Sequence, residues 1–274
     1  MEPDRVADEW LKWAESKFPH IGIKYLIDTG WIAHFPILQK MIGCKQSPIH
    51  HPEGDVMTHT LMVLEMSGRL EFTDFISKQA QTFAALLHDT GKPGTQFEYA
   101  NGNITNWGHE NVSAVKVKEF LVAIHPEKFN FLINKVSELV VNHMMFHRAD
   151  EITKRTVRRA TFGLKYNTFE ELVTLISSDI IGRKLSREMG VEAIDLVLSL
   201  WTTSNSVTAE TKAPTLQRVI DGKFLVSKGV KPGVQYGLIL KDCEDNQIEG
   251  TLTLENREEW WKAYSQNVST IEYV

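Results

Sequence analysis

A histidine and an aspartate stand side by side at the end of an apolar stretch of the sequence. His88 and Asp89 directly follow the apolar run 83–87, which predicts a buried helix. Burying an imidazole and a carboxylate costs free energy unless a partner satisfies them, and a divalent cation is one such partner. The pair is therefore a candidate metal-binding element.

Two further ionisable side chains stand in similar surroundings. Asp179 lies within the apolar run 175–181, and His59 lies near the start of the apolar segment 56–70. Nitrogen and oxygen ligands on buried helices suit a divalent cation such as Mn, Mg, Fe, Co, Ni or Zn. The residues alone leave a second interpretation open, in which His–Asp pairs form a buried hydrogen-bonded network that holds helices together.

The elements that must position these residues are predicted from apolar spacing and from Gly and Pro at their ends. Helical patterns recur along the chain, and alternating strand patterns are nearly absent. The predicted helices cover residues 3–17, 36–42, 56–70, 75–87, 109–124, 127–147, 152–162, 168–188, 190–201 and 234–247, with a last helix around Trp260. The fold class is therefore predicted as all-α.

One polar segment divides the predicted helices into two domains. Residues 202–211 are rich in Ser, Thr and Asn and are predicted as a linker. The linker separates a helical domain at 1–201, which includes an N-terminal helical extension, from a small and mainly helical unit at 212–274. The Trp-rich ends of the chain either pack on their own domains or form an interface, so the oligomeric state is left open.

The composition excludes several classes of protein. The chain has 274 residues, with 30 Lys and Arg against 35 Asp and Glu, and is 42% hydrophobic and 24% charged. These values are typical of a globular protein and argue against disorder, a fibre or general coating of nucleic acid. Cys44 and Cys243 are too few for a disulfide framework. No signal-like segment or long apolar run occurs, so we expect a cytoplasmic protein without a membrane span.

The order of these residues resembles a known family. His59, the pair His88-Asp89 and the distant Asp179 follow the H…HD…D pattern of the HD-domain phosphohydrolases, and the local sequence LLHDTGK is similar to that family's HD-x-GK segment. The resemblance implies an HD-domain helical bundle in which these four residues ligate a divalent cation. It also implies hydrolysis of phosphate esters by water that the cation activates.

Other segments narrow the resemblance to the bacterial tRNA nucleotidyltransferases that add CCA and carry an HD domain. The similar segments are HPEGDVMTHT at 51–60, GHE at 108–110, DIIGR at 179–183 and residues 225–250. The nucleotidyltransferase head of those enzymes has no counterpart, because about 30 residues precede the matching region and no Gly-Gly…Asp-x-Asp motif occurs. CCA addition is therefore not expected, and the hydrolytic and RNA-binding half remains.

The resemblance to dinuclear members of the family implies further metal ligands. Asp89 would bridge to a second cation held by His109 and His143, so we expect one or two ions. The alternative for these histidines is a polar rim that meets the substrate. His143 and His147 stand at i and i+4 of a predicted helix, and either can face the site.

Charged residues beside the proposed ligands are candidates for substrate contacts. The candidate catalytic residues are Asp89, Lys92 and Arg183. The side chains of Lys92 and Arg183 can both bind phosphoryl oxygens, and the alternative for each is a solvated surface charge. Glu53 and Asp55 are candidates for a general acid, a partner of a ligand or a loop cap. The basic run KRTVRR at 154–159 either follows a phosphate backbone or forms a solvated face, and Trp107 either stacks on a base or belongs to a core.

These features predict a metal-dependent phosphohydrolase, acting as a phosphodiesterase or phosphatase on nucleotide or RNA-terminal phosphate esters. The candidate substrates are a 2′,3′-cyclic phosphodiester, a 2′-phosphate and a nucleoside monophosphate, and the expected partners are a nucleotide, an RNA 3′-end or tRNA. Two alternatives remain: a non-catalytic module that binds RNA or the tRNA end, and a hydrolase of cyclic nucleotides.

Overall fold

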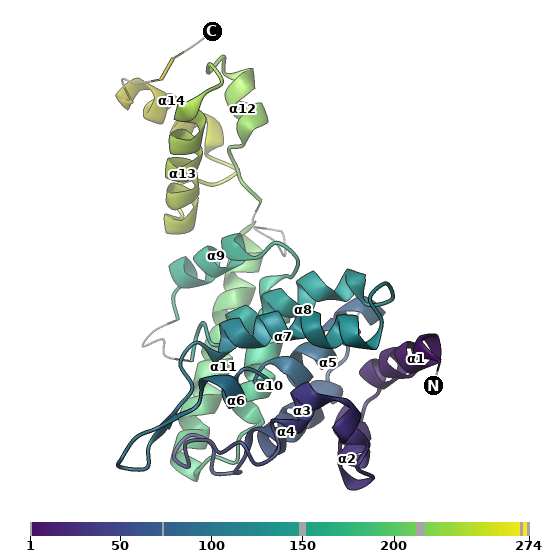
Figure 1. Ribbon diagram of the computed structural model, residues 1–274. Helices are drawn as coiled ribbons and strands as arrows, with labels where there is room; N and C mark the ends of the chain where they lie inside the picture. Colours follow the sequence, from purple (N-terminus) through teal and green to yellow (C-terminus); the bar gives the residue numbers. More distant parts are fainter. Residues whose placement is uncertain (1, 73, 148–151, 212–216, 269–270, 273–274) are drawn as a thin grey trace. The chain divides into compact units, whose positions relative to one another are not determined.

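The computed structural model describes residues 2–72, 74–147, 152–211, 217–268 and 271–272, and its regular structure is almost entirely helical (Figure 1). Two short strands, β1 (Phe97–Glu98) and β2 (Ile104–Thr105), pair antiparallel as a hairpin. The predicted all-α class is therefore confirmed. Among the helices of the described residues, none is both long enough and apolar enough to cross a membrane.

The chain divides into two compact units, with unit 1 within residues 1–152 and 164–204 and unit 2 within 153–163 and 205–274. The helices of unit 1 are α1 (Pro3–Glu15), α2 (Pro19–Asp28), η1 (Trp31–His34), α3 (Pro36–Gln39), α4 (Val56–Gly68), α5 (Phe75–Leu87), α6 (Lys92–Thr95), α7 (His109–Ile124), α8 (Asn130–Asn142) and α10 (Phe169–Ile181). Unit 2 contains α9 (Lys154–Gly163), α12 (Gly222–Ser227), α13 (Val234–Glu249) and α14 (Arg257–Asn267), and α11 (Arg187–Thr211) contributes to both units.

The central helix of unit 1 is α5, which is buried on all sides from Lys78 to Leu87. It packs against α1, α4, α7, α8 and α10, which can be followed in Figure 1. A helix that is buried all round belongs to a core rather than to a surface. The end of α5 therefore delivers the next residue, His88, to the interior, where its side chain is fully buried.

Local sequence determines where α4 and α10 begin. Asp55 caps α4 by accepting the backbone N–H of Thr58 at 2.8 Å. Thr168 and Glu171 form a capping box at the start of α10. Caps of this kind stabilise a helix by about 1 kcal/mol. The two helices that carry the predicted ligands His59 and Asp179 thus have defined first turns.

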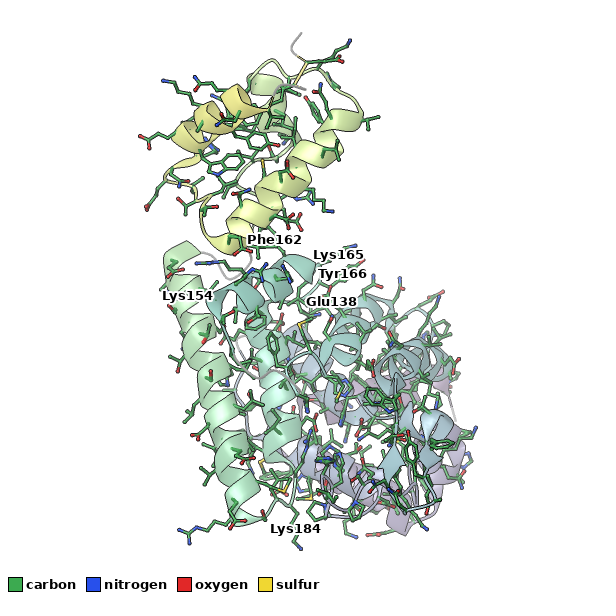
Figure 2. The ribbon with its side chains drawn as sticks, turned by 90° about the vertical axis from the view of Figure 1, so that its left-hand side faces the viewer. Glu138, Lys154, Phe162, Lys165, Tyr166 and Lys184 are labelled. Carbon is green, nitrogen blue, oxygen red and sulfur yellow. The ribbon has the colours of Figure 1, made fainter. Side chains whose placement is uncertain are left out.

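Glu138 of α8 holds the segment that leads into α10. Its carboxylate accepts the backbone N–H groups of Lys165, Tyr166 and Asn167 at 2.6 to 2.9 Å (Figure 2). Successive N–H groups that point at one carboxylate form a favourable anion site. The contact thereby fixes α10 relative to α8 through the backbone.

Unit 2 has a hydrophobic core of its own. The core residues are Ile220, Phe224, Leu225, Val230, Ile239, Cys243, Leu252 and Trp261. Trp10 in unit 1 and Trp261 in unit 2 are 6% and 5% exposed. The Trp-rich ends of the chain therefore pack within their own units.

Residues 202–211 were predicted as a linker, but the structure shows them as helix. These residues continue α11 instead of forming an irregular connection. Ser204 and Val207 are buried at helical spacing, so tertiary packing overrides the modest helix propensity of Ser, Thr and Asn. Residues 153–163, which the prediction assigned to the first domain, group with unit 2. Residues 212–216, at the start of the predicted C-terminal unit, lie outside the described residues.

Gly91 allows α6 and α7 to approach each other closely. A Cβ atom at position 91 would lie 2.2 Å from His109 O and 2.8 Å from Ser113 Oγ, whereas a Cβ atom at Gly94 would meet no neighbouring atom within 4 Å. We expect Gly91→Ala to lower the free energy of unfolding by about 2 kcal/mol relative to Gly94→Ala, because overpacking typically costs about 1–3 kcal/mol. Urea denaturation measures the difference, and equal stabilities would contradict the close approach.

Candidate metal centre

Helix ends bring four histidines together in the interior of unit 1. His59 lies in the first turn of α4, and His109 is the first residue of α7. His88 and His143 are the C-cap residues of α5 and α8. All four side chains are buried, with exposed fractions of 5% or less. The fold therefore places these rings where each needs a polar partner.

Backbone carbonyl groups hold three of these rings by the Nδ1 atom. Each contact runs from residue i to the carbonyl of residue i−3: His88 to Ala85 at 2.9 Å, His109 to Asn106 at 2.8 Å and His143 to Val140 at 2.6 Å. Two of the carbonyls belong to the last turn of a helix, where carbonyl groups lack partners within the helix. A carbonyl can only accept, so Nδ1 carries a proton in each ring and Nε2 is turned to the interior.

The fourth ring, His59, lies against a carboxylate instead of a backbone carbonyl group. Its Nδ1 lies 2.9 Å from Glu53 Oε1, and the same oxygen lies 2.9 Å from His51 Nδ1. Burial opposes ionisation of Glu53, but the contacts with both histidines outweigh burial and lower the pKa of Glu53. Burial lowers the pKa of His51 to about 3, so that ring is neutral. On the other side of the ring, Nε2 of His59 faces inward and lies 2.9 Å from Asp179 Oδ1.

The first group of converging atoms comprises His59, His88 and Asp179, whose ligand atoms lie within 4.8 Å of one another. Nε2 of His59 lies 2.9 Å from Asp179 Oδ1. His59 is thus placed between the carboxylates of Glu53 and Asp179. Nε2 of His59 and Oδ1 of Asp179 face each other in this group, and a divalent cation can take the place of the hydrogen bond between them.

The second group comprises Asp89, His109 and His143, again within 4.8 Å of one another. His109 Nε2 lies 3.1 Å from Asp89 Oδ1 and 3.3 Å from His143 Nε2. The other oxygen of Asp89, Oδ2, faces the first group, at 3.2 Å from His88 Nε2 and 3.8 Å from His59 Nε2. The Asp89 carboxylate therefore lies between the two groups.

The electrostatics of the centre favour positive charge. Burial alone would lower the pKa of His88, but the charge of Asp89 outweighs burial and raises it. Burial also opposes ionisation of Asp89 and Asp179, yet the charges of His88 and Arg183 respectively hold both pKa values well below the ordinary value. For His143, burial holds the pKa well below its usual value, so the ring is neutral. Neutral imidazole and ionised carboxylate are the forms that bind metals.

The donor set fits a divalent cation. Among the described side chains, Nε2 of His88 and both oxygens of Asp89 are buried without a partner in hydrogen-bonding geometry. Buried polar atoms in native proteins are almost always satisfied. Imidazole nitrogen together with carboxylate oxygen suits divalent transition metals such as Mn, Fe, Co, Ni and Zn. The residues present therefore fit the predicted metal.

Lys92 lies against the same carboxylate, as expected from its place in the sequence. Its Nζ is 2.7 Å from Asp89 Oδ2 and donates to Gln46 Oε1 at 2.7 Å. Lys92 and Gln46 are both buried, with exposed fractions of 6% and 5%. Gln46 was not predicted, because it comes from a loop without apolar periodicity or a recognisable motif.

Arg183 and His147 surround Asp179 from the other side. Arg183 Nη2 lies 3.4 Å from both Asp179 oxygens and 2.8 Å from His147 Nδ1. His147 Nε2 lies 3.0 Å from Asp179 Oδ2. Of the two histidines at i and i+4, both face the centre, His143 toward the second group and His147 toward Asp179.

Other residues singled out in the sequence lie outside the centre. Asp55 acts as a helix cap, and Trp107 is 65% exposed, which contradicts a core position. The basic run of α9 pairs with acids of unit 2, namely Lys154 and Arg158 with Glu210, and Arg155 with Glu249. Most of this run is therefore neutralised by acids.

Comparison with known proteins finds one matching family model and several similar proteins. Residues 56–177 match the family model described as HD domain, and Asp179 follows two residues later on α10. The chain is similar to the Multifunctional CCA protein of Methylococcus capsulatus, with 30% identity over 188 residues that cover 66% of this chain and 42% of that protein. The corresponding proteins of Halorhodospira halophila and Mannheimia succiniciproducens are 36% identical over 166 residues (59% and 37% covered) and 27% identical over 227 residues (81% and 51% covered). The chain thus spans about half or less of the length of these relatives.

We expect Mn²⁺ to raise the thermal unfolding midpoint of metal-stripped protein. A cation at about 100 times its Kd adds about 2.7 kcal/mol to the free energy of unfolding. Asp89→Ala and His88→Ala should abolish the shift, whereas Asp28→Ala, which alters an exposed carboxylate paired with Lys24, should keep it. Differential scanning calorimetry with and without Mn²⁺ measures the shift, and an equal shift in Asp89→Ala would place the metal elsewhere.

Proposed function

Since the chain carries an HD domain at residues 56–177, as its sequence motifs predicted, we propose that it is a metal-dependent phosphohydrolase. The observation that carries the proposal is the position of Asp89. Its Oδ2 atom faces His88 and His59, and its Oδ1 atom faces His109 and His143. A carboxylate with one oxygen in each ligand group supports an arrangement of two cations bridged by Asp89.

The proposed ligands are His59, His88, Asp89 and Asp179 for one cation, and Asp89, His109 and His143 for the other. Divalent cations at such sites lower the pKa of a water ligand and neutralise charge on phosphoryl oxygens. The protein orients the ligands through the Nδ1 contacts, which set both the tautomer and the direction of each ring.

Two basic residues are proposed to bind the phosphoryl oxygens of the substrate. Lys92 donates one ammonium proton to Gln46 and forms an ion pair with Asp89, so its Nζ keeps a further proton for a phosphoryl oxygen. Arg183 has a planar fork of five N–H donors, of which Nη2 faces His147 and Asp179. Both residues lie beside a proposed ligand, where they can bind a phosphate ester without displacing the cation.

The substrate class is proposed from the similarity to CCA proteins. We propose nucleotide or RNA-terminal phosphate esters, in particular a 2′,3′-cyclic phosphodiester, a 2′-phosphate or a nucleoside monophosphate. The similarity covers the HD region of proteins whose name refers to CCA, which supports an RNA end or tRNA as partner. A cyclic nucleotide also contains a cyclic phosphodiester, so it is included among the esters to be assayed.

We expect the purified protein to hydrolyse at least one of these esters in the presence of Mn²⁺, Co²⁺, Ni²⁺ or Mg²⁺. Chelation should abolish turnover, and so should Asp89→Ala, because the proposed bridging carboxylate is lost. Asp28→Ala serves as the folded control. Turnover is measured by chromatography, as release of phosphate from a monoester or as opening of the phosphodiester ring of a cyclic substrate.

Two outcomes would contradict the proposal in different ways. Turnover that survives Asp89→Ala would show that another site performs the reaction. Tight binding of tRNA with no turnover under any metal would favour the alternative of a non-catalytic RNA-binding module.

The ammonium group of Lys92 gives a separate prediction. Lys92→Met should lower kcat/KM by about 10²-fold, the usual size of the loss of one charged donor at a reacting group. Removing a positive charge beside Asp89 should leave the affinity for Mn²⁺ equal or higher. Steady-state kinetics and calorimetric titration measure the two quantities, with Lys24→Met as the control for an exposed lysine. Weaker Mn²⁺ binding together with unchanged kcat/KM would contradict a role in substrate binding.

A further inference from the structure

Gln46 is a buried amide whose two polar atoms have different surroundings. The residue is 5% exposed, and its Oε1 accepts a hydrogen bond from Lys92 Nζ at 2.7 Å. Its Nε2 is also buried, but this atom has no hydrogen-bond partner among the described residues. A lysine ammonium group can only donate, so the contact with Lys92 fixes which end of the amide is oxygen. The N–H groups of Gln46 are therefore donors that still require an acceptor.

Holding Lys92 does not by itself explain an amide at this position. A carboxylate would accept from Lys92 equally well and has no N–H group to satisfy. A buried donor without an acceptor destabilises the folded state, and such donors are rare in native proteins. The amide nitrogen of Gln46 therefore points to an acceptor that the protein itself does not provide.

This acceptor must lie beside the metal centre. The two polar atoms of Gln46 belong to one carboxamide group, so Nε2 stays close to the ammonium group of Lys92. The same ammonium group is 2.7 Å from Asp89 Oδ2. A group that meets both the amide and the ammonium therefore also lies next to the carboxylate between the two ligand groups.

The backbone on both sides of Gln46 is held in place. Lys45 forms an antiparallel bridge with Asp55, the residue that caps α4. On the other side, Ser47 O accepts the backbone N–H group of His51 at 2.8 Å. Helix α4 carries a proposed metal ligand in its first turn. The loop thus places the amide at a defined position relative to the centre, as a binding residue requires.

The chemistry of these donors identifies the kind of atom that they meet. A cation is excluded, because the amide oxygen is directed at Lys92 and N–H groups repel positive charge. Lys92 keeps a further proton close to the N–H groups of Gln46. Neighbouring donors fit an atom that can only accept, and the non-bridging oxygens of an ionised phosphate ester are of this kind.

We propose that Gln46 binds the substrate, with Nε2 donating to a non-bridging oxygen of the phosphoryl group that Lys92 also contacts. The inference rests on the proposed function, because it takes the phosphoryl group to lie beside Lys92 at the metal centre. One side chain then has two roles: Oε1 directs the ammonium group of Lys92, and Nε2 contacts the substrate. Because the amide is neutral, this contact leaves the net charge of the ligand groups unchanged.

The side-chain amide signal of Gln46 reports this contact directly. Spectra of protein labelled with ¹⁵N-glutamine are recorded with Zn²⁺ and then after addition of inorganic phosphate. Gln46→Met or Gln46→Glu assigns the signal by its loss. We expect one N–H proton of Gln46 to shift downfield with phosphate, because it is then donated to a charged oxygen. The signal of Gln39, an exposed residue of α3, should keep its position. An unchanged Gln46 signal would overturn the inference.

Variants separate the donor from the contact with Lys92. Gln46→Met should weaken binding of inorganic phosphate to the Mn²⁺-loaded protein by about 10- to 100-fold, the usual effect of losing a hydrogen bond to a charged group. Gln46→Glu keeps an acceptor for Lys92 but lacks the N–H donor, so it should not restore the affinity. Gln39→Met is the matched control and should bind phosphate as the wild type does.

Calorimetric titration measures these dissociation constants, and the unfolding midpoint with Mn²⁺ shows that each variant is folded. Wild-type affinity for phosphate in Gln46→Met would overturn the inference. Recovery of the affinity in Gln46→Glu would show that Gln46 acts only through Lys92, and would overturn it as well.

These readouts separate two kinds of failure. If no ester is hydrolysed but the amide signal and the phosphate affinities follow the expectation, the proposed function fails and the phosphoryl contact stands. If an ester is hydrolysed and phosphate leaves the Gln46 signal unchanged, only the phosphoryl contact fails. The signal of the wild-type protein remains decisive even where one variant does not fold.

Discussion

The rest of the structure depends on one electrostatic constraint, the convergence of imidazole nitrogens on the buried carboxylate of Asp89. Imidazole nitrogens approach both of its oxygens, and three of these rings have their Nδ1 protons committed elsewhere. Charges interact strongly in a buried environment, so such an arrangement persists only with positive charge nearby. Lys92 supplies one charge at 2.7 Å. Divalent cations in the two ligand groups would supply the remainder.

Helix termini are what bring these atoms together. Most of the histidines occupy the first residue or the cap of a helix rather than its middle. A helix end exposes carbonyl groups without partners, and the side chain that follows can bind them. The fold therefore supplies in one place both the ligand and the group that orients it. The full burial of α5 explains why this place is the interior of unit 1.

The fold class and the candidate ligands His59, His88, Asp89 and Asp179 could be predicted because they depend on local patterns, whereas His109 and His143 were expected only from the resemblance to dinuclear family members. Apolar runs mark α5 and α10, and the ionisable residues at or within these runs are conspicuous. Contacts between distant segments leave no such pattern. Gln46, for example, reaches Lys92 across 46 residues. The helical state of 202–211 was missed for a related reason, since the packing that stabilises it is not visible in its polar composition.

The contacts that orient the ligands also connect the lifetime of a bound cation to the dynamics of the backbone. When the last turn of α5 or α8 opens, the carbonyl of Ala85 or Val140 moves away and the ring beyond it loses its direction. Local opening of this kind is rare in enclosed elements and more frequent in elements that face solvent. Burial surrounds the last ten residues of α5 but follows only one face of α8. A cation in the proposed group that includes His143 should therefore exchange faster than one in the group that includes His88. The rate of exchange would be set by how often the last turn of α8 opens.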